Sequence, residues 1–194
     1  MLGSAVLGGE MLRQHGREEA EPMPRSEASE FEVRGALAAV DGCGRLRYEI
    51  VSASPIDDVW AALTEPERLA RWYGRVEGAL RVGGRYHAVL LPSGWEGDGH
   101  VLECEPGRRL RMESAEPGAP MTIDDIRLAP EAGGGTRLVL TRLRPSTEML
   151  AAYAVGTQLH LENLVAHLAG RAPVDAAAFW AALAPRYEEL AAGI

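Results

Sequence analysis

The sequence predicts an α+β domain in which a curved antiparallel sheet holds one long helix near the C-terminus. Two observations support this fold class. Residues 147–170 have the longest helical hydrophobic period in the chain, and the residues before them form a series of short alternating strands separated by turn signals. An apolar stripe of that length needs a broad partner surface, so we expect the helix to lie across the concave face of the sheet.

The predicted long helix has one apolar stripe and two recognisable ends. Glu148 would lie in its first turn, where a carboxylate interacts favourably with the helix dipole. Gly170 provides a C-terminal stop and is followed by Pro173. The helix would be roughly 35 Å long at 1.5 Å per residue. Its stripe consists of Leu150, Tyr153, Thr157, Leu161, Leu164 and Leu168.

A hairpin and two short helices are expected before the main body of the sheet. Residues 35–40 and 45–53 flank Asp41-Gly42, a hairpin turn signal, and the second strand alternates apolar with charged side chains. In the following stretch, Ser54 is expected to cap the first short helix, and Thr64, Glu65 and Pro66 to start the second, which ends at Gly74.

The rest of the chain predicts a strand meander and a final helical segment. Strands of this spacing, with turn signals between them, pair as antiparallel neighbours. Residues 175–190 are amphipathic, and Pro185 should bend or interrupt them. We expect this segment to pack on its own domain rather than on a second subunit. The expected meander strands are 75–80, 85–92, 98–105, 108–114, 121–128 and 136–143.

Composition excludes several classes of partner. The net charge of −8 and pI of about 5.2 argue against nucleic acid and against an anionic membrane surface. No apolar run approaches the roughly 20 residues of a membrane span. Cys43 and Cys104 form neither a disulfide framework nor a metal-site spacing, which indicates a reducing, cytoplasmic location. No metal or other cofactor is predicted.

The domain organisation predicted from composition has two parts. Residues 14–34 are rich in Glu and Arg and poor in apolar side chains, and we expect the whole of residues 1–34 to be a disordered extension. Met11 and Met23 are alternative start positions, so whether residues 1–22 belong to the native protein stays open. Residues 35–194 form the predicted domain, with 174–190 as an appended helical segment.

The order of elements and several ordered motifs resemble a known family. VWAALTEPERLARWYG is followed by VGGRY, GHVLECEPGRRL, GGTRLVLT and GTQLHLENLVAHLAG, and this set resembles the activator of heat-shock protein 90 ATPase homologues, in the START-like (SRPBCC) superfamily. The resemblance covers about Gly35–Gly170. It implies a helix-grip fold with a cavity between sheet and helix that binds apolar or amphipathic small molecules. The superfamily includes lipid carriers, cyclases and co-chaperones, so the fold leaves the function open.

Thr157 is the position where the chain departs from that family. The resemblance implies a tryptophan here, directly after the glycine that matches Gly156. A small side chain facing the sheet would leave a larger void. The alternative is that Tyr153, Met149 or Trp60 fills the space, because protein interiors rarely contain large empty volumes.

Asp124 and Arg142 are candidates for a buried ion pair. Periodicity does not decide whether Asp124 or Ile123 faces the interior, but the family pattern places Asp124 inside, in phase with Ile126 and Leu128. A buried carboxylate needs a partner. Arg142 lies on the next predicted strand and could supply it. The alternative is that both residues are solvated near the open end of the sheet.

His160 is the remaining polar candidate in the predicted cavity. It precedes Leu161 in the long helix, and a structural histidine is favoured over a catalytic one. His167 shares its helix face, but no cysteine or carboxylate completes a metal site. No Ser/His/Asp or Cys/His set is recognisable.

Three functions are compatible with these features. The favoured one is non-catalytic binding of a small apolar or amphipathic ligand by a carrier or sensor. The second is an enzyme of the cyclase or dehydratase type, with Asp124 or His160 as acid or base. The third is a co-chaperone-like module, and a second copy of the chain and a chaperone are candidate partners. The expected ligand-binding residues are Tyr48, Trp60, Tyr86, Met112, Asp124, Arg142, Tyr153, Thr157 and His160.

Overall fold

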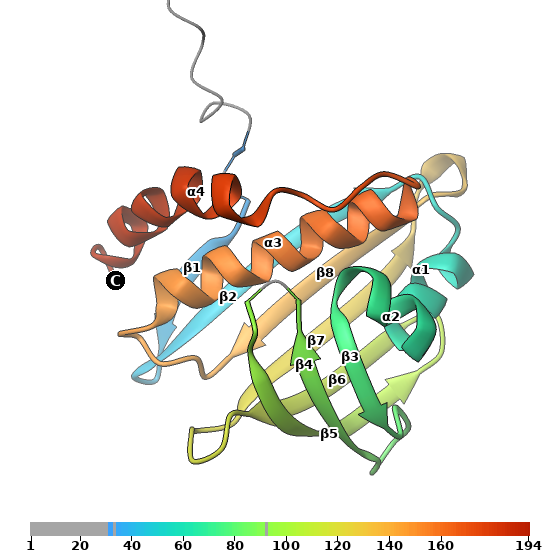
Figure 1. Cartoon of the computed structure of the whole chain (residues 1–194), viewed down its shortest axis with the longest axis horizontal. Helices are drawn as coiled ribbons and strands as arrows, with labels where there is room; N and C mark the ends of the chain where they lie inside the picture. Colours follow the sequence, from blue (N-terminus) through green and yellow to red (C-terminus); the bar gives the residue numbers. More distant parts are fainter. Residues whose placement is uncertain (1–30, 33, 92) are drawn as a thin grey trace, which may run out of the picture.

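The computed structural model describes residues 31–194 except 33 and 92, so the predicted disorder of residues 1–34 falls almost entirely outside the described part. Eight antiparallel strands form one curved sheet, and helix α3 (Leu150–Leu168) runs along its concave side (Figure 1). The predicted helix-grip fold is confirmed. Within the described residues, no helix is long and apolar enough to cross a membrane.

The strands follow the predicted segments closely. The first hairpin turns at Asp41 and Gly42, both with positive φ, as a two-residue turn of this kind requires. The eight strands are β1 (Ala36–Val40), β2 (Cys43–Ser52), β3 (Gly74–Gly78), β4 (Arg85–Leu90), β5 (Glu96–Glu105), β6 (Arg109–Ala115), β7 (Thr122–Pro130) and β8 (Thr136–Leu143).

The sheet order is β1-β2-β8-β7-β6-β5-β4-β3. Strands β3 to β8 are therefore a meander, and β2 pairs with the last strand of that meander. The short helices α1 (Ile56–Thr64) and α2 (Pro66–Trp72) connect β2 at one side of the sheet to β3 at the far edge. This connection leaves α2 beside α3, over the concave face (Figure 1).

The predicted helix starts need three corrections. Pro55, with φ of −58° and ψ of 153°, is the N-cap of α1, so Ser54 lies outside the helix and no side chain caps it. Glu65 is the N-cap of α2, and the Thr64 hydroxyl instead donates to the carbonyl of Trp60. Helix α3 begins at Leu150, so Glu148 precedes it and adds no charge to its first turn.

The C-terminal end of α3 was predicted correctly. Gly170 has a φ of +66°, and its N–H donates to the carbonyl of His167, while the N–H of Arg171 donates to Ala166. This pair of bonds is the Schellman arrangement, in which glycine is favoured because it adopts positive φ without a Cβ clash.

Helix α3 is buried on more than the predicted stripe because α4 (Ala176–Ala191) covers its other side. Asp175 caps α4 by accepting from two backbone N–H groups. Helix α4 packs on its own domain, as expected, and Pro185 lies within it without interrupting it. Its buried face consists of Phe179, Leu183 and Tyr187, each 0% exposed.

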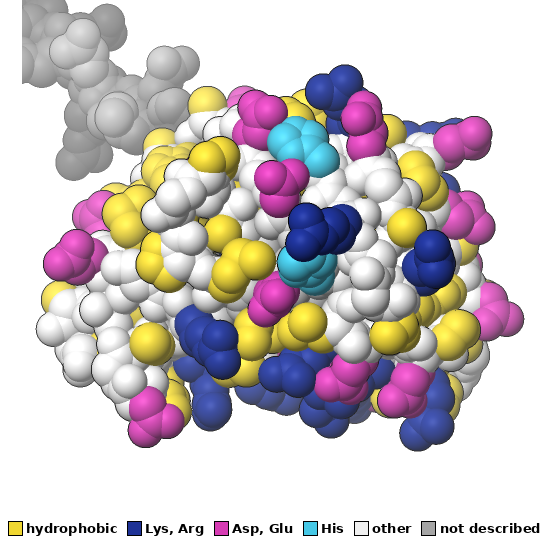
Figure 2. Space-filling model, turned by 90° about the horizontal axis from the view of Figure 1, so that it is seen from below, with side chains coloured by type: hydrophobic (Ala, Val, Ile, Leu, Met, Phe, Trp, Pro, Cys, Tyr) yellow, Lys and Arg dark blue, Asp and Glu magenta, His cyan; other side chains and the backbone are white. Residues whose placement is uncertain are grey.

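Arginines on the convex sheet face are held in cross-strand ion pairs. Arg109 on β6 donates to both oxygens of Asp125 on β7, at 2.9 and 2.8 Å, and Arg137 on β8 pairs with Glu49 on β2. Figure 2 shows acidic and basic side chains interspersed over one face of the molecule, with basic ones gathered along its lower edge. Surface pairs of this kind each contribute roughly 0.2–1 kcal/mol, so even these partly buried ones support the sheet only modestly.

The docking of α4 should be a major source of stability. Phe179→Ala removes a fully buried ring that also packs edge-on against Phe31, and we expect it to lower the free energy of unfolding by about 3–5 kcal/mol. Urea denaturation measures this. Leu190→Ala is the matched control, because Leu190 lies on the same helix and is 47% exposed. Equal losses from both substitutions would contradict the packing of α4.

Candidate functional site

A buried ion pair lies on the concave face of the sheet beneath α3. Asp124 on β7 and Arg142 on β8 are directly opposite each other in the strand register. Arg142 donates from Nε and Nη2 to the two carboxylate oxygens, each at 2.7 Å. The two side chains are 10% and 17% exposed, so the pair is largely shielded from water. The structure thus contains the suggested pair and places Asp124 in phase with Ile126 and Leu128.

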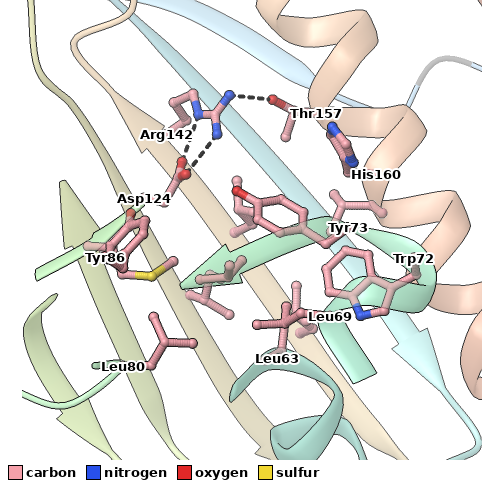
Figure 3. Close-up of a pocket in the computed structure, with 16 residues that line it drawn as sticks. Leu63, Leu69, Trp72, Tyr73, Leu80, Tyr86, Asp124, Arg142, Thr157 and His160 are labelled. Atoms are coloured by element: carbon pink, nitrogen blue, oxygen red, sulfur yellow. Dashed lines mark hydrogen bonds and ion pairs between the residues drawn. The ribbon is translucent and has the colours of Figure 1, made fainter. Parts of the chain in front are cut away.

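The guanidinium of Arg142 also connects the sheet to α3. Its Nη1 donates to Thr157 Oγ1 at 3.1 Å, and its Cζ lies 5.8 Å from the ring centroid of Tyr153. Figure 3 shows Arg142 reaching from its strand to both Asp124 and Thr157. Burial alone would lower the pKa of Arg142, but the Asp124 carboxylate more than offsets this and raises it, so the guanidinium stays charged.

His160 and Tyr73 complete the polar group around Arg142. Their rings meet edge-on, with centroids 5.1 Å apart. The Nδ1 atom of His160 is buried and has no hydrogen-bond partner among the described residues. Burial and the nearby Arg142 charge lower the pKa of His160 from 6.5 to about 4, so the ring is neutral at pH 7. Burial likewise raises the pKa of Tyr73 to about 12.

A small apolar cavity lies on the inner side of this polar group. Its volume is about 60 Å³, which is well below the roughly 150 Å³ of a cavity that holds benzene. We call it the inner cavity. Aliphatic and aromatic side chains from α1, α2, the sheet and α3 surround it, namely Leu63, Leu69, Trp72, Val76, Leu80, Tyr86, Met112, Ile126, Leu138, Leu140 and Leu161.

A larger groove, the outer groove, lies on the other side of the polar group. Its volume is about 320 Å³, within the range of small-molecule sites. Helix α3 forms one wall, the β4–β5 and β6–β7 loops form the other, and α4 adds Trp180 at the rim. Its lining includes Leu90, Trp95, Ser114, Glu116, Pro120, Thr122, Met149, Ala152, Tyr153, Gly156 and Trp180.

The two spaces meet at four residues that line both. We call Tyr73, Arg142, Thr157 and His160 the junction. They come from three elements: the C-terminal cap of α2 supplies Tyr73, β8 supplies Arg142, and α3 supplies both Thr157 and His160. A molecule in the outer groove would therefore touch polar groups at its inner end and apolar groups along its body.

The predicted ligand-binding residues divide into four groups. Tyr86, Met112 and Asp124 line the inner cavity, and Tyr153 lines the outer groove. Arg142, Thr157 and His160 line both. Tyr48 and Trp60 line neither space, which corrects the sequence-based expectation of cavity lining for both.

Close packing explains why Tyr48 and Trp60 are not at the site. Tyr48 is 1% exposed and its hydroxyl donates to the carbonyl of Ala154 at 2.7 Å, where α3 sits directly on β2. Trp60 packs against the hydrophobic core from α1. The sheet–helix interface is thus filled at the β2 side, and the two spaces lie against the part of the sheet from β8 to β3.

The side chain that lies against Thr157 is that of Arg142. Trp60 lines neither of the spaces beside Thr157. Tyr153 lies with its ring centroid 5.8 Å from Arg142 Cζ, and Met149 is 54% exposed at the rim of the outer groove. The guanidinium of Arg142 lies against Thr157 instead, and open space remains on both sides of it.

The residues of the site that were not among the expected ones include Tyr73, Gly156 and Trp180. Tyr73 lies in the predicted second short helix, and Trp180 lies in the predicted amphipathic segment 175–190. Gly156 was noted as a family match, but a glycine in the middle of a long helix is itself a signal, because it costs roughly 0.5–1 kcal/mol relative to alanine. A Cβ at Gly156 would meet only Trp180, at 4.0 Å, so the position opens onto the groove.

No metal centre accompanies these residues. Within residues 31–194, apart from the undescribed 33 and 92, no three His, Cys, Asp or Glu side chains are arranged to hold a metal ion. His167 accepts from Arg68, which also pairs with Asp58 at 2.6 Å. That arrangement connects α1, α2 and α3 at the surface, away from the junction.

This fold and cavity define the START-like (SRPBCC) class of proteins, and the comparison with known families agrees. Residues 53–169, more than half of the chain, match the family described as Activator of Hsp90 ATPase homolog 1-like protein. The chain belongs to that family. No match was found among curated proteins.

Solved structures support the same assignment. CalU16 from Micromonospora echinospora is 28% identical, with a TM-score of 0.67 over 81% of this chain and 97% of that protein. DynU16, a protein in the dynemicin biosynthetic locus, is 24% identical, with a TM-score of 0.60 over 66% of this chain and 48% of that one. EF2215 from Enterococcus faecalis, of unknown function, is 18% identical, with a TM-score of 0.65 over 82% and 91%. The last two likenesses concern the fold alone.

The lowered pKa of His160 predicts a specific pH dependence. In the unfolded chain the ring should titrate near 6.5 and in the folded protein near 4, so the unfolded state binds more protons between these values. The contribution of His160 to stability should therefore be complete above pH 6.5 and be lost as the pH falls toward 4. NMR titration of the histidine ring protons measures the pKa directly.

His87 is the internal control for that titration. It is exposed on β4, and its hydrogen bond to Asp98 raises its pKa above the ordinary value. The two histidines should therefore shift in opposite directions. A His160 ring that titrates near 6.5 would show that it is open to water and that the junction is not enclosed.

Proposed function

We propose that this protein binds a small amphipathic molecule without transforming it, as a carrier or sensor, with the ligand body in the outer groove and its polar end at the junction. The observation that supports this most is the meeting of the two spaces at Arg142, Thr157 and His160. An apolar lining with a few convergent polar groups is typical of small-molecule sites. Membership of a family with a ligand-binding fold is consistent with it.

The dimensions support the outer groove as the main binding space. The inner cavity, at about 60 Å³, has room only for a small alkyl group, whereas the groove has about 320 Å³. Exposed apolar side chains, Met149 and Trp180, stand at the groove and could contact the ligand body. The inner cavity would then accept a short substituent that extends past Arg142.

The polar groups are better arranged for binding than for acid–base chemistry. Both oxygens of Asp124 are bonded to Arg142, and Asp124 lines the inner cavity but not the outer groove, so its carboxylate is not presented to a ligand body in the groove. His160, with a pKa near 4, is a weak base and is unprotonated at neutral pH, so it cannot act as an acid there. These two facts favour binding over a cyclase or dehydratase reaction.

Gly156 offers a direct test. Gly156→Phe places a ring in the outer groove, where the nearest obstacle is the Trp180 side chain, and should reduce ligand retention at least about tenfold. Native mass spectrometry of protein purified from its own host, with solvent extraction of bound molecules, measures retention. The proposal predicts a defined extra mass on the wild type that is absent from Gly156→Phe.

Gly156→Ala is the matched control. It adds only a methyl group at the same helix position, should stabilise the fold by roughly 0.5–1 kcal/mol, and should keep the ligand. Wild-type protein that is free of any bound molecule, or a Gly156→Phe variant that retains it fully, would overturn the proposed function.

A further inference from the structure

We propose that the group recognised at the junction is an uncharged oxygen acceptor, a carbonyl, on a ligand that carries no net charge. This rests on the proposed function and specifies the chemical class of its ligand. Three features support it: the charges at the junction are already balanced, the junction has unused hydrogen-bond donors, and the two spaces are lined by acidic side chains.

The charge of the site is already balanced without a ligand. Asp124 neutralises Arg142 through two bonds of 2.7 Å, and both side chains are largely buried. His160 is neutral at pH 7. A carboxylate brought to the junction would therefore be one uncompensated negative charge, and moving such a group out of water is far more costly than moving a neutral carbonyl.

The acidic side chains that line the two spaces also disfavour an anionic ligand. Among the described residues, the charged side chains that line either space are Asp124, Arg142 and Glu116. Glu116 is exposed on the β6–β7 loop, at the mouth of the groove. The chain as a whole carries a net charge of −8. An anionic ligand would be repelled on approach and after entry, although salt screens the long-range part.

The junction nevertheless offers donors to a neutral acceptor. A guanidinium has five N–H groups, and Arg142 uses three of them on Asp124 and Thr157, which leaves two without a partner among the described residues. Neutral His160 has one further ring N–H, on whichever of its two nitrogens carries the proton. A carbonyl oxygen, which can accept two hydrogen bonds, fits this surplus.

The experiment compares three fluorescent probes of nearly equal size. Prodan is an uncharged naphthyl ketone whose emission reports the polarity of its surroundings. Its first analogue has a carboxylate in place of the propanoyl group, and its second has a methylene in place of the carbonyl. We expect Prodan to bind at least about tenfold more tightly than either analogue, because one brings an unpaired charge and the other lacks the acceptor.

Two variants distinguish a wrong inference about the ligand class from a wrong proposal about the binding site. Glu116→Gln removes the exposed acid at the groove mouth and should strengthen binding of the carboxylate more than that of Prodan. Gly156→Phe should abolish binding of every probe. If the carboxylate binds as tightly as Prodan and Gly156→Phe still blocks both, the inference is wrong and the proposed function stands. If no probe binds, or if Gly156→Phe has no effect on binding, both are wrong.

Discussion

The ion pair between Asp124 and Arg142 is the interaction on which the interior of this protein depends. Burying two charges costs several kcal/mol for each ion, and good geometry with further hydrogen bonds is needed to offset that cost. Here the forked geometry of the guanidinium matches the carboxylate, and Thr157 supplies an additional acceptor. Two adjacent strands and the long helix are thereby connected through one side chain.

That connection also explains why the interior is divided. Threonine at position 157, instead of the tryptophan that the family resemblance implies, leaves room for Arg142 to cross from β8 to α3. The guanidinium then separates an apolar cavity from a wider groove, with Tyr73 and His160 beside it. At the β2 side, by contrast, Tyr48 bonds directly to the backbone of α3 and leaves no space. The small side chain at position 157 therefore provides the room that the Arg142 guanidinium occupies between sheet and helix.

The elements of the fold were predictable because their signals are local. The Asp41-Gly42 turn, the alternation along β2 and the Gly170 stop depend on neighbouring residues only. The helix starts were less predictable, since a residue caps a helix only if its backbone angles allow it, and Pro55 rather than Ser54 adopts them. The ion pair was predictable once a phase was chosen for β7, because the pairing register then aligned the two residues.

The outline of the site was not predictable, for a physical reason. Which part of a sheet–helix interface stays open depends on the angle at which the helix crosses the sheet and on what covers its back. Trp180 reaches the groove only because α4 returns along α3, and Trp60 is excluded because α1 packs it into the core. Neither arrangement has a signature in the sequence near those residues.

The central claim is that a ligand enters the outer groove and meets Arg142 at the junction. NMR spectra of the backbone amides, the arginine Nε–H groups and the leucine methyl groups, recorded while Prodan is added, test it most directly. The account predicts large shifts at the Arg142 Nε–H and the Gly156 amide, and small ones at Leu46, which is fully buried on β2. Shifts concentrated around Leu46 and Tyr48, with Arg142 unchanged, would contradict it.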